Sequence, residues 1–112
     1  MHIQIDPANP LTPIILQGRL DATQAEYMSH TLRQAAEASP HLILNMAEVD
    51  FIDSSGLAAL VQVMKYCRQG GGDLLLCHLQ DNPRIIFDLT RLDKAFRIFD
   101  DCDQAVRALQ ES

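Results

Sequence analysis

The stretch VDFIDSSGL, residues 49–57, decides the fold, because within a few residues it changes from an apolar run to an amphipathic helical pattern. The apolar residues that follow recur at helical spacing and are Leu57, Leu60, Val61, Met64 and Cys67. This spacing predicts a helix with one buried face from about Leu57 onward. Asp53, Ser54 and Ser55 are residue types that accept hydrogen bonds from the free amides of a helix's first turn.

The same stretch offers a place for an anion. A helix N-terminus carries partial positive charge and unpaired backbone amides, so it tolerates negative charge. A serine hydroxyl at this position can therefore carry a phosphate without unfolding the helix. On the motif alone, Ser54 and Ser55 are more often ordinary helix caps, because serine is a favoured capping residue.

Length and composition limit the fold and the classes of partner. A chain of 112 residues, 47% of them hydrophobic, fits one domain over residues 1–112 that buries a core without metal. The net charge of −6 argues against bulk attraction to nucleic acid or to an anionic membrane. No run approaches the roughly 20 apolar residues that cross a bilayer, and the N-terminus lacks the basic segment of a signal peptide. We therefore expect a cytoplasmic protein without membrane insertion.

Cysteine and histidine placement gives no sign of a cross-link or a metal site. The three cysteines, Cys67, Cys77 and Cys102, are widely spaced and odd in number. This arrangement favours reduced thiols in the core over a disulfide framework. The four histidines have no metal-ligand spacing with the cysteines, so no metal is expected.

Apolar runs alternate with helical patterns on both sides of the central stretch. Strands are predicted at residues 2–5, 14–18, 41–46, 74–77 and 96–99. Helices are predicted at residues 22–38, from the Asp53–Ser55 capping group to the glycines at 70–72, from residue 81 with a buried face of Ile85, Ile86 and Leu89, and over Ala105, Val106 and Leu109. The strand at 14–18 is expected to be buried on both faces, and Asp21 or Thr23 to cap the helix after it.

The alternation also predicts where two loops meet. Apolar strands separated by helices favour parallel pairing with right-handed crossovers. In a parallel sheet every strand-to-helix loop emerges at the same edge. The loop at 18–21 follows one strand, and the loop at 49–55 follows the strand at 41–46 after a short excursion. Asp21 and the group Asp53–Ser55 should therefore lie on one face, where loops on a rigid scaffold often carry function.

Four segments of the chain resemble a known family, and they are Asp53–Leu57, GRLD at 18–21, residues 70–77 and IFDLTRL at 86–92. The first looks like the phosphorylation motif of the anti-sigma factor antagonists, the bacterial STAS domains, and the second like their glycine-x-leucine-aspartate element. The resemblance implies the STAS fold, an α/β arrangement with a mixed, mostly parallel sheet of four to five strands and about four helices. The proline-rich stretch at 7–13 departs from the family in character.

The resemblance also implies a role in signal transduction and transcription regulation. A serine kinase or anti-sigma factor of GHKL type would bind the domain and phosphorylate Ser55, and a PP2C-type phosphatase would remove the phosphate. The supporting and partner-binding residues implied in this way are Asp21, Asp53, Ser54, Gly56 and Leu57. The domain itself would have no enzymatic activity and no cofactor.

Three other functions are compatible with an α/β domain that carries a serine at a helix start. A serine hydrolase would need the glycine-x-serine-x-glycine elbow that Ser55 lacks. A phospho-acceptor receiver domain would need a lysine near a late strand, and the late strand holds no suitable one. A constitutive STAS interaction or scaffold subunit, for example a transporter-associated one, shares the fold and leaves the serine unmodified. The presence of Asp21 together with Ser55 favours the switched form.

Overall fold

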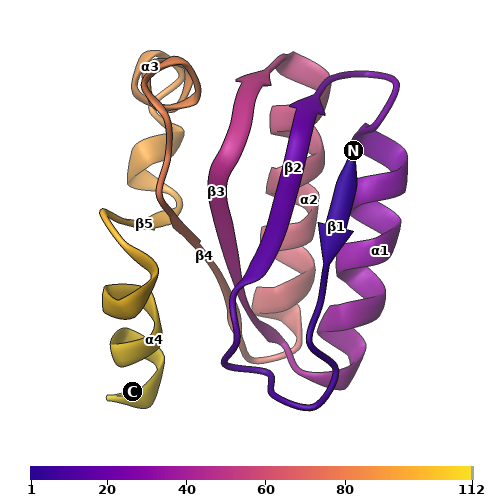
Figure 1. The fold of residues 1–112 in the computed structure, drawn as a ribbon, viewed down its shortest axis with the longest axis vertical. Coiled ribbons are helices and arrows are strands. Elements are labelled where there is room, and N and C mark those ends of the chain that lie inside the picture. Colours follow the sequence, from indigo (N-terminus) through magenta and orange to yellow (C-terminus); the bar gives the residue numbers. More distant parts are fainter. Residues whose placement is uncertain (112) are drawn as a thin grey trace.

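The computed structural model describes residues 1–111 and contains a five-stranded sheet with helices on both faces (Figure 1). The strands are β1 (His2–Gln4), β2 (Ile14–Leu20), β3 (His41–Ile52), β4 (Asp73–Cys77) and β5 (Arg97–Phe99). The helices are α1 (Ala25–Ala38), α2 (Ser54–Gln69), α3 (Asp81–Leu89) and α4 (Cys102–Gln110), with a 3-10 turn at Leu92–Lys94. Strand order follows the sequence, with β1 antiparallel to β2 and the other neighbours parallel. The predicted fold class is confirmed.

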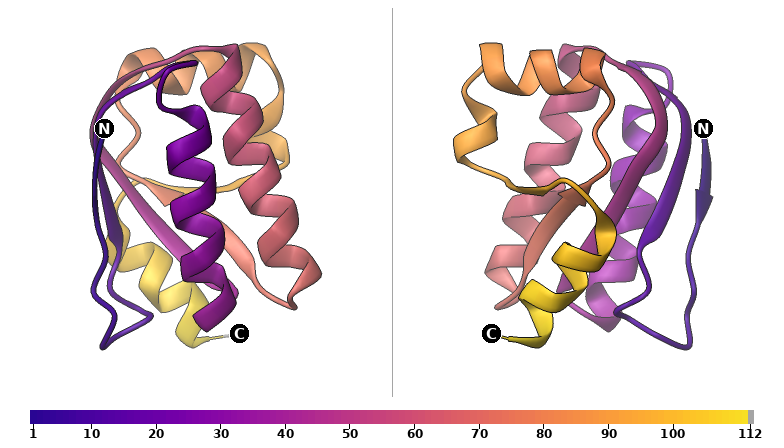
Figure 2. Two further views of the ribbon diagram at one scale, coloured as in Figure 1. Left: turned by 90° about the vertical axis from the view of Figure 1, so that its right-hand side faces the viewer. Right: turned by 60° about the vertical axis from the view of Figure 1, so that its left-hand side comes forward.

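The helices divide between the two faces of the sheet. α1 and α2 lie side by side on one face, and α4 covers part of the other (Figure 2). The larger core fills the space under α1 and α2, and a smaller cluster under α4 consists of Ile43, Leu75, Cys77 and Ala105. β4 is therefore buried on both faces, as its apolar run predicts. Within residues 1–111, no helix has the length and apolar character that crossing a membrane requires.

β2 is buried on one face only, so the prediction of a strand covered on both faces is wrong. Leu16 and Leu20 are fully buried, whereas Ile15 is half-buried and Arg19 is exposed. The reason is the position of α4, which contacts β3, β4 and β5 and leaves the second face of β2 to solvent.

β3 is longer than its apolar run suggests, and the predicted excursion after residue 46 is absent. The strand continues to Ile52 because Val49 and Ile52 face the core while Asp50 faces solvent. The register between β2 and β3 shifts twice, which places extra residues of β3 opposite β2. Leu20 nevertheless pairs with Ile52, so both strands end at the same level of the sheet.

α3 begins as predicted, with Asp81 in its first turn and Pro83 close behind, but of its predicted buried face only Ile86 packs against the core. Pro83 and Phe87 are buried, one turn apart on the same side of the helix. The Phe87 ring packs edge-on against Phe96, with 5.3 Å between ring centroids. Burying this larger ring rotates Ile85 and Leu89 to the outside, where they are 54% and 79% exposed.

The structure contains a disulfide between Cys77 and Cys102, so the prediction of three reduced thiols is wrong. Cys77 is the last residue of β4 and Cys102 is the first of α4. β5 pairs with the end of β4 and returns the chain to that end, which brings the two Cα atoms within 5.1 Å. This separation lies within the range that a disulfide spans. The bond therefore attaches α4 covalently to the sheet.

Reduction of this bond should lower stability substantially. The bond closes a loop with a sequence separation of 25 residues. A loop of this length stabilises a folded chain by about 3.5 kcal/mol, mainly by restricting the unfolded state. Urea denaturation with and without dithiothreitol should show this difference. The Cys102→Ser variant should match the reduced protein and give no response to dithiothreitol, and a response equal to that of the unaltered chain would contradict the assignment.

Cys67 is a fully buried free thiol, as predicted for a core cysteine. Burial raises the pKa of the Cys67 thiol from 9.0 to about 11. The folded chain thus holds this proton more tightly than the unfolded chain, so the stabilisation is complete below pH 9 and is lost as the pH rises towards 11.

We expect slow labelling of the native Cys67 thiol by a disulfide reagent at pH 8. The urea midpoint should also fall less steeply between pH 9 and 11 in a Cys67→Ala variant, and rapid native labelling would contradict this view.

Candidate functional site

α2 begins at Ser54, within the group of residues predicted to cap its first turn, and Asp53 is its capping residue. The Asp53 carboxylate accepts a hydrogen bond from the Gly56 amide at 2.9 Å, and its main-chain carbonyl accepts one from Leu57 at 2.9 Å. Ser54 and Ser55 consequently occupy the first turn of the helix instead of capping it. Both serine side chains are exposed. The first turn of α2 therefore presents two hydroxyls to solvent, next to a carboxylate that already satisfies one helix amide.

Asp53 also joins the two loops that the sequence predicts to meet. Its second carboxylate oxygen accepts a hydrogen bond from the Ala22 amide at 3.2 Å. Its main-chain amide donates to the Leu20 carbonyl at 3.2 Å. The prediction that the loop after β2 and the loop after β3 lie side by side is confirmed. One carboxylate thus fixes the distance between Asp21 and the first turn of α2.

Asp21 shapes its own loop and does not cap α1. Its carboxylate accepts hydrogen bonds from the Thr23 hydroxyl at 2.6 Å and the Thr23 amide at 3.0 Å. The hydroxyl of Thr23 is the main cause that lowers the pKa of the Asp21 carboxyl, with Arg19 adding to the effect. The residue before α1 is Gln24, whose side chain makes no capping bond. The capping role predicted for Asp21 or Thr23 is therefore wrong, and Asp21 is a charged group in a tight turn.

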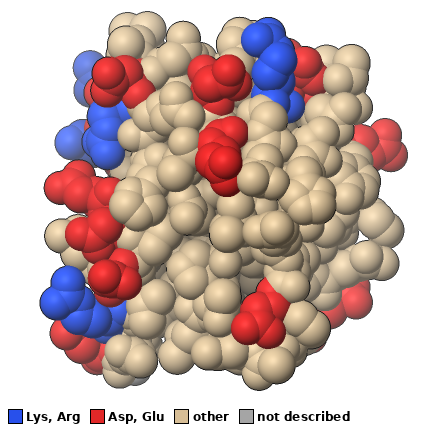
Figure 3. Space-filling view, viewed as in Figure 1, with Lys and Arg blue, Asp and Glu red and all other residues tan. Residues whose placement is uncertain are grey.

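The edge where β2 and β3 end is charged. On the sheet face of Figure 3, acidic side chains lie beside a basic one along the upper edge, and most of the middle is uncharged. The Arg19 side chain lies 3.9 Å from the Asp21 carboxylate and also stacks over the Phe51 ring at 4.0 Å. A new negative charge at this edge would therefore meet acidic neighbours that Arg19 compensates only in part.

Gly56 and Leu57 contribute packing to the site. Gly56 is buried against the main chain of Leu20, and a Cβ at this position would overlap the Leu20 carbonyl oxygen and lie 2.7 Å from Leu20 Cγ. Leu57 is only 6% exposed and belongs to the core under α2. These two residues hold the start of α2 against the end of β2, and Leu57 offers little surface to a partner.

Ser55 also lines a groove of about 380 Å³ between α1 and α2, which the sequence did not reveal. The opposite wall is formed by Ser29 and Arg33, one turn apart on α1, and Gln62 continues the groove on α2. The Arg33 side chain donates to the Ser29 carbonyl at 3.3 Å. Because Ser29 and Arg33 are four residues apart, the sequence places them on one side of α1. Only the packing of α1 on α2 shows that this side faces Ser55.

Comparison with known proteins identifies the family. The STAS domain profile matches residues 4–105 of the chain. The chain belongs to the STAS domain family. The anti-sigma F factor antagonist of Paenibacillus polymyxa is 27% identical over 115 residues, which cover 99% of this chain and 96% of that protein.

Two solved structures resemble this STAS domain. The Bacillus cell fate determinant SpoIIAA in its phosphorylated form matches with a TM-score of 0.70 at 22% identity, over 96% of this chain and 99% of that one. A sulfate transporter family protein from Wolinella succinogenes matches with a TM-score of 0.74 at 25% identity, over 88% and 85%. The family recognised from four sequence segments is thereby confirmed, and the comparisons include both an antagonist and a transporter-family protein.

Proposed function

We propose that this STAS domain is a regulator of the anti-sigma factor antagonist type, switched by reversible phosphorylation of Ser55. Its partner would be a serine kinase or anti-sigma factor of GHKL type, and a PP2C-type phosphatase would reset it. The observation that carries the proposal is the exposed Ser55 hydroxyl on the first turn of α2, next to a loop that Asp53 holds in place. The kinase would supply ATP chemistry, so the domain needs neither catalytic residues nor a cofactor, and the switch would operate in the cytoplasm.

Phosphorylation at Ser55 is compatible with the fold. Within residues 1–111, the Ser55 hydroxyl forms no hydrogen bond, so its phosphorylation would not break one. A phosphate adds about −1.5 to −2 charges at neutral pH, and the amides at a helix N-terminus partly offset such charge. The structure therefore supports a switch that changes the surface charge and leaves the backbone in place.

Asp21, Asp53 and Ser54 would support this switch in different ways. The charged Asp21 lies in the neighbouring loop and would recognise the kinase or orient the acceptor serine. Asp53 would position Ser55 through its cap, since its two oxygens hold Gly56 and Ala22. Ser54 would lie at the contact surface without being modified.

Replacement of Ser55 tests the site directly. The Ser55→Ala variant should carry no phosphate after incubation with host extract and ATP under phosphatase inhibition. Its urea midpoint should remain close to that of the unaltered protein, because the hydroxyl is exposed. Intact-mass analysis with peptide mapping measures the first result. Ser54→Ala is the matched control and should still gain one phosphate, whereas phosphorylation that persists in Ser55→Ala would exclude the assignment.

A constitutive STAS interaction subunit is the second candidate. The similarity to the sulfate transporter family protein favours it, because that likeness covers most of this chain at 25% identity. In this case the surface around Ser55 would bind a partner without modification. A homogeneous, unmodified protein under all growth conditions, and after incubation with host extract and ATP, would favour this candidate over the phosphorylation switch.

A further inference from the structure

The groove that Ser55 lines also contains a cation. Among the residues described along this groove, Arg33 is the only basic one and Glu26 is the only acidic one. The other lining residues are neutral, and they are Ala25, Ser29, Ser55, Ala58, Ala59 and Gln62. Arg33 belongs to α1 and Ser55 to α2, so the packing of the two helices brings them to one groove.

The Arg33 guanidinium has hydrogen-bond donors to spare. Its Nε donates to the Ser29 carbonyl at 3.3 Å. Within residues 1–111, its two terminal nitrogens form no hydrogen bond and the side chain forms no ion pair. Glu37, one turn further along α1, instead accepts a hydrogen bond from the Tyr66 hydroxyl at 3.3 Å. The positive charge of Arg33 is therefore available to another acidic group.

The Arg33 side chain extends towards the end of the groove where Ser55 lies. α1 and α2 both begin at the edge where β2 and β3 end, and they run side by side in the same direction (Figure 2). Side chains on a helix lean towards its N-terminus, and the bond to Ser29 holds Arg33 in that direction. The residues at 25, 58 and 59 in this part of the groove are alanines, so they leave room for a phosphate.

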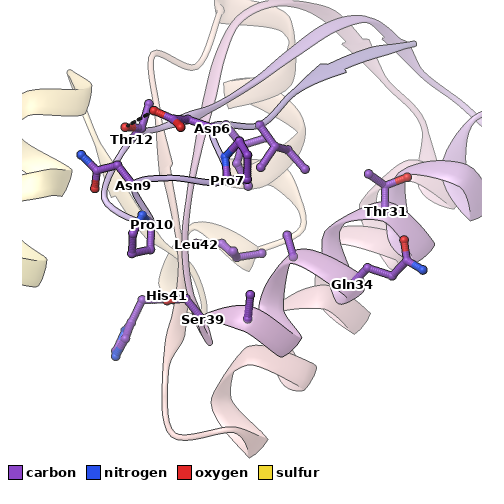
Figure 4. A pocket seen from close by; sticks show the side chains of 14 residues that line it. Asp6, Pro7, Asn9, Pro10, Thr12, Thr31, Gln34, Ser39, His41 and Leu42 are labelled. Atoms are coloured by element: carbon purple, nitrogen blue, oxygen red, sulfur yellow. Dashed lines mark hydrogen bonds between the residues drawn. The ribbon is translucent and has the colours of Figure 1, made fainter.

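The other side of α1 offers no such cation. A hollow of about 320 Å³ lies there, under the proline-rich connection between β1 and β2 (Figure 4). The residues described as lining this hollow include no lysine or arginine. α1 contributes Thr31 and Gln34 to the hollow, whereas Ser29 and Arg33 line the groove beside α2. Of these two depressions, only the groove beside α2 therefore offers a positive charge to a phosphate.

We propose that Arg33 binds the phosphate carried by Ser55 and thereby connects α1 with α2. Arginine donors match the oxygens of a phosphate in pairs, and such charge-assisted bonds are stronger than bonds between neutral groups. The phosphate carries about −1.5 to −2 charges at neutral pH, so one arginine leaves part of this charge unbalanced, and Glu26 adds to the remainder. The inference rests on the proposed modification of Ser55 and adds the place where the phosphate lies.

Phosphorus-31 NMR of the full chain, with phosphoserine incorporated at position 55 during synthesis, tests the contact without a kinase. A neighbouring guanidinium favours the doubly charged phosphate and so lowers the second pKa of the phosphate. At about pH 6 we expect the ratio of doubly to singly charged phosphate to be about threefold higher in this protein than in its Arg33→Gln variant, which is the size of effect typical of an exposed ion pair.

Two controls separate the contact from the general effect of charge. Arg107→Gln removes the same charge from α4, on the opposite face of the sheet, and should leave the ratio unchanged. Phosphoserine at position 54, which is not among the residues described along the groove, should give the same ratio with and without Arg33→Gln. An equal ratio in the unaltered and Arg33→Gln proteins would overturn the proposal. Equal effects of Arg33→Gln at both positions, or of Arg33→Gln and Arg107→Gln, would also overturn it.

Failure of this contact and failure of the proposed function give different results. If Arg33→Gln has no effect on the phosphate while Ser55 gains a phosphate in host extract, the role of Arg33 alone is rejected. If NMR shows the contact while Ser55 gains no phosphate in host extract, the switch is rejected and the groove remains a site that holds phosphoserine.

Discussion

Replacement of Gly56 by alanine is expected to lower the free energy of unfolding by about 4 kcal/mol. Overpacking a core commonly costs about 1 to 3 kcal/mol, and the cost exceeds this range where the neighbour cannot move. Here the added methyl group would overlap the Leu20 carbonyl oxygen, which is part of the main chain of β2. That carbonyl also accepts the hydrogen bond from the Asp53 amide. Relief of the overlap would therefore separate β2 from the start of α2.

Urea denaturation measures the Gly56→Ala effect. Ser54→Ala, two residues earlier on the exposed side of the same turn, is the control and should change the free energy of unfolding by less than about 0.5 kcal/mol. If Gly56→Ala were as stable as Ser54→Ala, the close approach of α2 to Leu20 would be wrong. In that case, any loss of partner binding in the Gly56→Ala variant would need a cause other than reduced stability.

Phosphorylation of Ser55 is expected to weaken partner binding at least tenfold. A partner that covers this edge must remove water from the phosphate, and unpaired buried charge costs several kcal/mol. A cost of about 1.4 kcal/mol already reduces affinity tenfold. Among the neighbours described above, Arg19 is engaged with Asp21, and Arg33, across the groove from Ser55, would offset the phosphate charge only in part. The effect requires no change in the fold.

Calorimetric titration of the kinase partner with protein that carries phosphoserine at position 55 measures this loss. Ser55→Asp adds less charge and should weaken binding in the same direction by a smaller factor. Ser54→Asp places the same charge outside the groove between α1 and α2 and should have the smaller effect of the two aspartate variants. Equal affinity of the phosphorylated and unmodified proteins would exclude a switch by charge.

Local sequence patterns were sufficient to predict most of the secondary structure and the contact between two loops. Within residues 1–111, the alternation of apolar runs and helical stripes identified the five strands and the four α-helices, although it ended β3 six residues early. The glycines at 70–72 ended α2 as expected, with Gly71 at φ +90°. The meeting of the Asp21 loop and the Asp53 cap followed from parallel topology alone. These features depend on short stretches of chain or on a general rule of sheet geometry.

Features that depend on long-range packing could not be predicted in this way. The pairing of Cys77 with Cys102 depends on where β5 returns the chain, and the outward position of Leu89 depends on the contact between the Phe87 and Phe96 rings. The groove beside Ser55 requires the packing of α1 on α2. Spacing within one helix gives the side on which a residue lies, but not the element that this side faces.

The double hydrogen bonding of Asp53 has a kinetic consequence. Because one carboxylate holds both the Gly56 and Ala22 amides, the two loops need no rearrangement before a partner can dock. Association would then be limited by diffusion and orientation, and competing partners would arrive at similar rates. Which partner is bound at a given time would depend mainly on how quickly each one leaves. A modification that accelerates departure would thus redistribute the domain among its partners within the residence time of a single complex.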